Sequence, residues 1–193
     1  MGIAPSYMKM KISGNKSIEE LISKAKQRAL ESPYHGCATS TFTALAEVLE
    51  MESRDEVFKC MIGLAGGVGH LTKGTCGALI GAAAAISLNY NKSKRDVIEA
   101  IGTPNALHPQ DPYIPLFFQD IFEAIALVAN KLQEKYGGTL CNEIQRSLYG
   151  KAFDLLNPKK HVKFVEFMQS YPVNCYTVES DIVGWTMGIL LNK

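Results

Sequence analysis

The chain has 193 residues, of which 47% are hydrophobic, and this size and composition predict one domain over residues 1–193 with its own core. The formal net charge is +1 and basic and acidic residues are mixed along the sequence, so neither a nucleic acid nor a membrane surface is an expected partner. The longest apolar run is shorter than the roughly 20 residues of a membrane-spanning helix, and the first residues contain no apolar signal-peptide core, so we expect a soluble, cytoplasmic protein.

Helical periodicity runs through most of the chain, and no strand-like alternation competes with it. Two capping boxes, Ser17 with Glu20 and Ser53 with Glu56, mark helix starts. The helices expected on this basis cover residues 17–32, 37–50, 53–64, 76–90, 116–136 and 158–170 and the segment from 175 onward, with a short helix from 93 and a broken one after 141. We therefore predict an all-α bundle of about six to eight helices.

Two stretches depart from this helical pattern. Residues 1–16 precede the first capping box and are expected to form a flexible N-terminus. Residues 91–115 are expected to form an irregular insertion, because the part from 102 to 115 contains four prolines, which interrupt helices.

Five cysteines are an odd number in a chain large enough to fold without disulfides, which indicates thiols with a chemical role in a reducing compartment. Four of them, Cys37, Cys76, Cys141 and Cys175, stand where an expected helix begins. A helix start offers unpaired backbone N–H groups and the positive end of the helix dipole, and both favour a thiolate over a thiol. We predict that these four form one redox or metal site, whereas Cys60, in mid-helix among apolar neighbours, is expected to be a packing residue.

The segment 66–74 is rich in glycine and leads into the second of these cysteines. We do not expect a nucleotide-binding loop, because Thr75 and Cys76 stand where such a loop carries Lys followed by Ser or Thr. We expect the segment to let the backbone approach the site closely. Gly77 is predicted to border the cofactor, and His70 is a candidate hydrogen-bond donor or substitute ligand.

The hexapeptide Cys76-Gly-Ala-Leu-Ile-Gly81 matches the CGAxxG signature of a known family, and the other family cysteines fall on Cys37, Cys141 and Cys175 in the same order. The chain resembles this C-GCAxxG-C-C family over roughly residues 17–191. The family is named for suspected redox activity, and a related domain occurs in the split-Soret cytochromes, where an iron–sulfur centre is suspected. The resemblance implies a redox role for the four cysteines. The chain has no Cys-x-x-Cys-His, so c-type haem is not expected.

Three functions are compatible with this pattern. The leading hypothesis is an iron–sulfur cluster, held by all four cysteines, for electron transfer or redox sensing. The alternatives are a thiol–disulfide oxidoreductase that uses pairs of the same cysteines, and a non-catalytic module that binds a metal or a small molecule. No Cys-x-x-Cys pair is present, so neither a ferredoxin-type loop nor a zinc ribbon is expected. An electron-transfer protein or a small molecule is the expected partner, and the apolar helices leave room for a homodimer.

Overall fold

The computed structural model describes residues 17–34, 36–51, 54–90, 92–101 and 117–192, and these form nine helices. The helices are α1 (Ile18–Leu30), α2 (Cys37–Val48), α3 (Arg54–Ile62), α4 (Gly77–Tyr90), α5 (Lys94–Ile101), α7 (Gln119–Tyr136), α8 (Cys141–Tyr149), α9 (Pro158–Gln169) and α10 (Cys175–Leu191). Within the described residues the only extended pairing is an isolated bridge between Thr75 and Leu140. The predicted all-α fold is confirmed, with one helix more than the upper end of the expected range.

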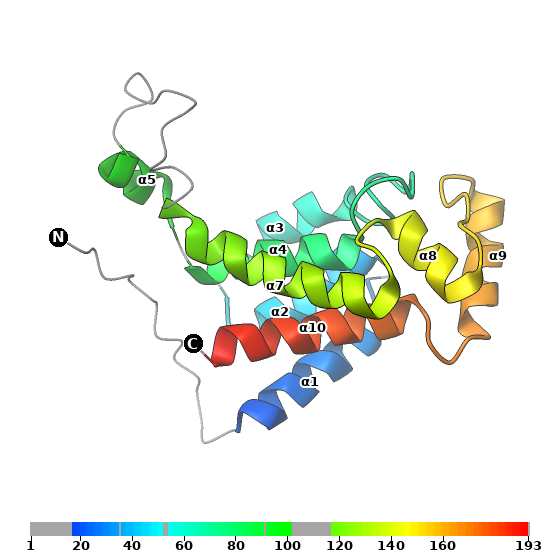
Figure 1. Ribbon diagram of the computed structural model, residues 1–193, viewed down its shortest axis with the longest axis horizontal. Coiled ribbons are helices and arrows are strands. Elements are labelled where there is room, and N and C mark those ends of the chain that lie inside the picture. The colour runs from blue at the N-terminus through cyan, green and yellow to red at the C-terminus, as the bar shows by residue number, and fades with distance from the viewer. Residues whose placement is uncertain (1–16, 35, 52–53, 91, 102–116, 193) are drawn as a thin grey trace.

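Five helices build the main bundle: α1, α2, α4, α7 and α10 (Figure 1). Its centre consists of apolar side chains that are fully buried, among them Phe42, Leu45, Ile86, Leu132, Ile182 and Met187. Helices α2 and α4 approach at backbone distance, because a Cβ atom on Gly81 would lie 2.4 Å from the carbonyl oxygen of Ala38. The small residues of α4 therefore allow close contact between these two helices.

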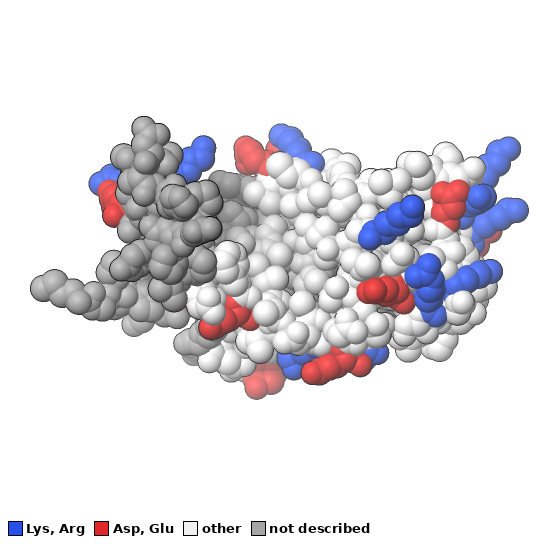
Figure 2. Space-filling view, turned by 45° about the horizontal axis from the view of Figure 1, so that its top comes forward, with Lys and Arg blue, Asp and Glu red and all other residues white. Residues whose placement is uncertain are grey.

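A second hydrophobic cluster lies at the α8–α9 end of the molecule (Figure 1). Its buried members are Tyr149, Leu155, Phe164 and Met168, and the Tyr149 ring stands edge-on to several neighbouring aromatic rings. Figure 2 shows basic and acidic side chains side by side at this end, as the mixed charge pattern of the sequence predicts. The cluster is separate from the main core, and this separation creates the site described below.

The structure bears on two details of the sequence interpretation. The short helix expected from residue 93 is present as α5, within the stretch 91–115, and its start is capped by Ser93 and Asp96: the Ser93 hydroxyl accepts from the Asp96 N–H at 3.2 Å, and the Asp96 carboxylate accepts from the Ser93 N–H at 2.6 Å. Cys60 is exposed, so its assignment to packing is wrong: only the opposite face of α3 is covered by α2 and α4.

Several expectations fall on residues outside the described part of the chain. These are the flexible N-terminus over 1–16, the cap at Ser53 and the proline-rich stretch 102–115. Among the described helices, none is both long and apolar enough to cross a bilayer.

Candidate functional site

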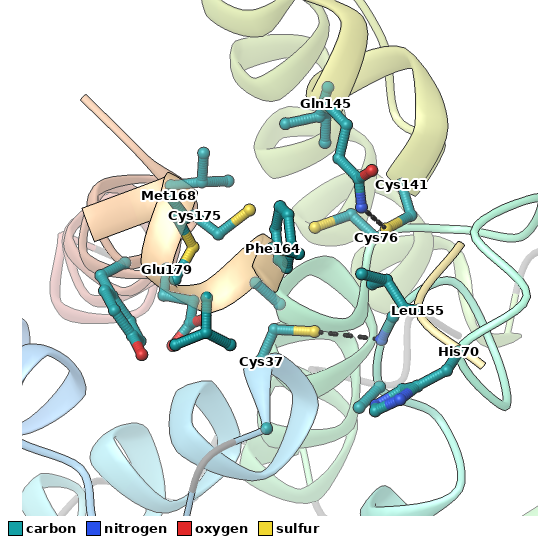
Figure 3. A pocket seen from close by; sticks show the side chains of 18 of the residues that line it. Cys37, His70, Cys76, Cys141, Gln145, Leu155, Phe164, Met168, Cys175 and Glu179 are labelled. Atoms are coloured by element: carbon teal, nitrogen blue, oxygen red, sulfur yellow. Dashed lines mark hydrogen bonds between the residues drawn. The ribbon is translucent and has the colours of Figure 1, made fainter. Parts of the chain in front are cut away.

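The four cysteines predicted to act together line one pocket of about 100 Å³ (Figure 3). Cys37, Cys141 and Cys175 are the first residues of α2, α8 and α10, and Cys76 immediately precedes α4. The helix starts inferred from the sequence are thus present at three of the four cysteines and one residue beyond the fourth. All four thiols are free.

The glycine-rich segment fixes Cys76 beside Cys141. The Cys76 N–H donates to the carbonyl oxygen of Thr139 at 2.8 Å, and the Cys141 N–H donates to that of Gly74 at 3.0 Å. These two hydrogen bonds flank the Thr75–Leu140 bridge and tie the start of α4 to the start of α8. Gly67 is required here, since its φ is +74° and a Cβ atom on it would lie 2.8 Å from the Cys141 Cβ. The predicted close backbone approach is therefore confirmed.

Gly77 makes room for a cysteine. A Cβ atom at this position would lie 2.4 Å from the Cys37 Sγ, so any side chain would collide with the sulfur. The glycine of the hexapeptide thus lets the start of α2 pack against the start of α4. Its predicted contact with a cofactor stays a prediction.

The comparison with known families agrees with this arrangement. A family model described as "Putative redox-active protein (C_GCAxxG_C_C)" matches residues 35–189. The chain belongs to this family. A protein of Archaeoglobus fulgidus, described as an "Uncharacterized protein", is 30% identical over 150 residues, which cover 75% of this chain and 86% of that protein. No solved structure matches the chain significantly.

Each family cysteine accepts hydrogen bonds at its sulfur. The Gly66 N–H donates to Cys37 at 3.4 Å, the Gln145 side-chain amide donates to Cys141 at 3.4 Å, and the Tyr149 hydroxyl donates to Cys175 at 3.5 Å. Backbone N–H groups in the first turn of α4 donate to the sulfur of Cys76. Donors of this kind stabilise negative charge on sulfur and shift the potential of sulfur-ligated centres.

Burial nevertheless dominates the acidity of these thiols. It raises the pKa of Cys141 to about 11 and, together with the charge of Cys141, that of Cys76 to about 12. The pKa values of Cys37 and Cys175 are also raised, again mainly by burial. The helix starts were expected to favour thiolates, but desolvation outweighs their N–H groups. Burial therefore favours the neutral thiols over the thiolates in this pocket.

Two histidines lie at the pocket, one expected and one not. His70 lines it, and its ring contacts that of His161 edge-on with 4.8 Å between the centroids; its role as donor or ligand stays a prediction. Burial and the nearby His70 lower the pKa of His161. Nothing in the sequence distinguished His161, because it lies on α9, 91 residues from His70 in the chain.

Glu179 and Gln145 are the main site residues that sequence reasoning missed. Gln145 is buried on α8, where its side chain also accepts from the Phe153 N–H at 2.8 Å. Glu179 lies on α10, is 4% exposed and lines the pocket, and burial raises the pKa of its carboxyl to about 8. One signal was available: Glu179 follows Cys175 by four residues, so both project from the same face of a helix.

Proposed function

We propose that the four cysteines hold an iron–sulfur cluster that transfers electrons or senses redox state. The observation that carries the proposal is the convergence of four thiols, from four helix starts, on one cavity with apolar walls. Four cysteine thiolates are the usual protein ligands of such clusters. The raised thiol pKa values agree with this, because positive iron would compensate for four buried thiolates.

The placement of the ligands favours a cluster over a single ion. In the described part of the chain, no three Cys, His, Asp or Glu side chains are arranged to hold a metal ion. A structural zinc ion would require four sulfurs at about 2.3 Å from one atom. A cluster distributes its cysteines over several irons, so the sulfurs of its ligands stand farther apart. The four cysteines line one cavity, which is compatible with that larger group.

The protein groups around the cluster would set its properties. Cys37, Cys76, Cys141 and Cys175 would bind iron, and the N–H and O–H donors to their sulfurs would stabilise the more negative, reduced state. The apolar side chains of the second hydrophobic cluster would exclude water. When bound, the cluster would supply one-electron chemistry.

A thiol–disulfide function is the second candidate, and one observation favours it. Cys76 and Cys141 are held side by side by backbone hydrogen bonds, and the charge of Cys141 is the largest influence of any neighbour on the Cys76 pKa. The raised pKa values act against it, because the attacking species in disulfide exchange is the thiolate.

Metal and sulfide analysis of the anaerobically purified full chain distinguishes these candidates. We expect iron and acid-labile sulfide in comparable amounts, with broad sulfur-to-iron absorption bands that bleach on reduction. Iron-free and sulfide-free protein after anaerobic reconstitution would contradict the cluster. A reversible change in the number of free thiols in that metal-free protein would favour the disulfide function, and bound metal without sulfide would favour a simple metal-binding module.

A further inference from the structure

Glu179 is a buried carboxyl to which the proposed function gives no role. Its side chain lines the cysteine pocket and is 4% exposed. Within the described residues, neither a hydrogen-bond donor nor a cation contacts its carboxylate, and the described lining of the pocket contains no Lys or Arg. A carboxyl buried without a partner is costly, and such groups are normally paired or bind a metal. A group bound inside the pocket would supply the partner that the Glu179 carboxylate lacks.

The position of Glu179 identifies which part of the centre it faces. It lies one helical turn after Cys175 on α10, on the same face. Its charge acts on the thiols of Cys37 and Cys175. Cys76 and Cys141 lie on the glycine-segment side, where their N–H groups donate to Thr139 and Gly74. Figure 3 shows Glu179 beside Cys37, on the α10 side of the pocket. The carboxyl thus belongs to the half of the site formed by α2 and α10.

We propose that Glu179 is a fifth protein ligand of the centre, with a carboxylate oxygen bound to one iron on the side of Cys37 and Cys175. This inference rests on the proposed function, because it requires iron in the pocket. A carboxylate is a harder ligand than a thiolate, and iron accepts both. One iron of the cluster would then differ from the others in its ligand set.

Mössbauer spectroscopy of the full chain, reconstituted anaerobically with isotopically enriched iron, tests this ligand directly. In the oxidised wild-type protein we expect one iron per cluster with a higher isomer shift than the rest, as an added oxygen ligand produces. In Glu179→Gln and Glu179→Ala that distinct iron should be lost, while iron and sulfide per chain stay the same. The exposed Glu134→Gln on α7 is the matched control and should keep the wild-type spectrum.

The outcomes separate this inference from the function on which it rests. A wild-type cluster whose irons all have sulfur ligands, or a distinct iron that survives both Glu179 substitutions, overturns the carboxylate ligand and leaves the cluster standing. A chain that takes up no iron and sulfide overturns both. If Glu179→Ala proves misfolded by circular dichroism, the near-isosteric Glu179→Gln and the wild-type spectrum still decide the question.

Discussion

At the scale of single residues, the site requires a position without a side chain at Gly77 as well as the four cysteines. Gly77→Ala would place a methyl group where the Cys37 sulfur now lies, 2.4 Å from the ideal Cβ position. Either the sulfur or helix α2 must move, so we expect a loss of about 1–3 kcal/mol in the free energy of unfolding, as overpacked cores show. Urea unfolding measures the loss, and iron content after reconstitution should fall with it.

Gly188→Ala in α10 is the matched control for this substitution, since nothing lies within 4 Å of its Cβ position. Alanine is the better helix former, so this variant should unfold at the same free energy as the wild type or up to about 1 kcal/mol higher. Equal behaviour of the two alanine variants would show that Cys37 does not need the space at Gly77.

The cysteines themselves give the second residue-scale prediction. Because the four cysteines lie at four separate helix starts and Cys60 does not line the pocket, no nearby thiol can replace a missing one. Serine at Cys37, Cys76, Cys141 or Cys175 should therefore abolish or strongly reduce the bound iron and sulfide. Cys60→Ser, at an exposed position, should bind the wild-type amount. A full cluster in any one of the four site variants would exclude the four-ligand arrangement.

The sequence could predict these cysteines and not their surroundings. A cysteine at a helix start is visible as a local pattern, and the ordered set Cys37, Cys76, Cys141 and Cys175 adds the family signature. Glu179, Gln145 and His161 reach the pocket only through the folded arrangement of α8, α9 and α10. The thiol pKa values were misjudged for the same reason, since burial belongs to the whole fold and helix position to the local sequence.

At the scale of helices, one carboxylate joins three elements of the main bundle. Asp181 on α10 is hydrogen-bonded by Lys135 at 2.5 Å and by the Tyr136 hydroxyl at 2.6 Å, both on α7, and lies 3.8 Å from Lys26 on α1. The Asp181 side chain is only 14% exposed, so these bonds are partly shielded from water. The junction holds α10, and with it Cys175, against the rest of the bundle.

Asp181→Asn should weaken this junction in a pH-dependent way. Burial acts to raise the pKa of Asp181, but Lys135, Tyr136 and Lys26 together hold it below its ordinary value. The carboxylate therefore contributes stability above the unfolded pKa of about 4, and this contribution is lost as the pH falls through the lower folded value. We expect the variant to lose about 1 kcal/mol near neutral pH, because both lysines are half-exposed and screened, and to lose less in acid. Urea unfolding across this pH range measures the difference.

Asp154→Asn is the control for this junction. Asp154 also pairs with a lysine, Lys160 at 3.0 Å, but both side chains are exposed, and exposed ion pairs contribute little. The free energy of unfolding should not change measurably. If Asp154→Asn and Asp181→Asn behaved alike, the shielding of the α1–α7–α10 junction would be irrelevant to stability.

Helix starts were predicted best where the signal was local. Ser17 caps α1 as its capping box indicated, and Asn157 and Asn174 cap α9 and α10, which begin at the predicted residues. The contacts between helices could not be predicted from the sequence. The isolated bridge pairs Thr75 with Leu140, which are 65 positions apart, and no strand-like alternation of apolar and polar residues predicts it.

At the scale of the whole molecule, the pocket lies between two hydrophobic clusters. The main core includes Cys76, Ala78, Ile144 and Val178, and the second cluster supplies Leu155, Phe164 and Met168 on the other side. The main bundle can bury its core without a ligand, so the metal-free protein should remain largely helical. Helix α9 belongs to the smaller hydrophobic cluster and covers the pocket. Fewer buried apolar side chains hold α9 in place than hold the helices of the main bundle.

Hydrogen exchange measured by mass spectrometry should reveal this division. In the metal-free protein, amides of α9 should exchange much faster than those of α2, α4 and α10, because the α9 side opens without unfolding the main bundle. The proposed iron–sulfur cluster would tie the starts of α2, α4, α8 and α10 together and fill the cavity beneath α9. Binding to the closed state stabilises that state by mass action, so exchange in α9 should slow by about tenfold or more on loading.

Helix α1 provides the internal reference for this measurement. It packs on α2 and α10 within the main bundle and contributes nothing to the described lining of the pocket, so its protection should change less than that of α9. A uniform gain over α1 and α9 would mean that the protein folds as one unit around the cluster. Unchanged exchange in α9, in protein shown to contain iron and sulfide, would mean that this helix does not close the site. A gain that is larger in α9 than in α1 is the expected result for a centre bound between the two hydrophobic clusters.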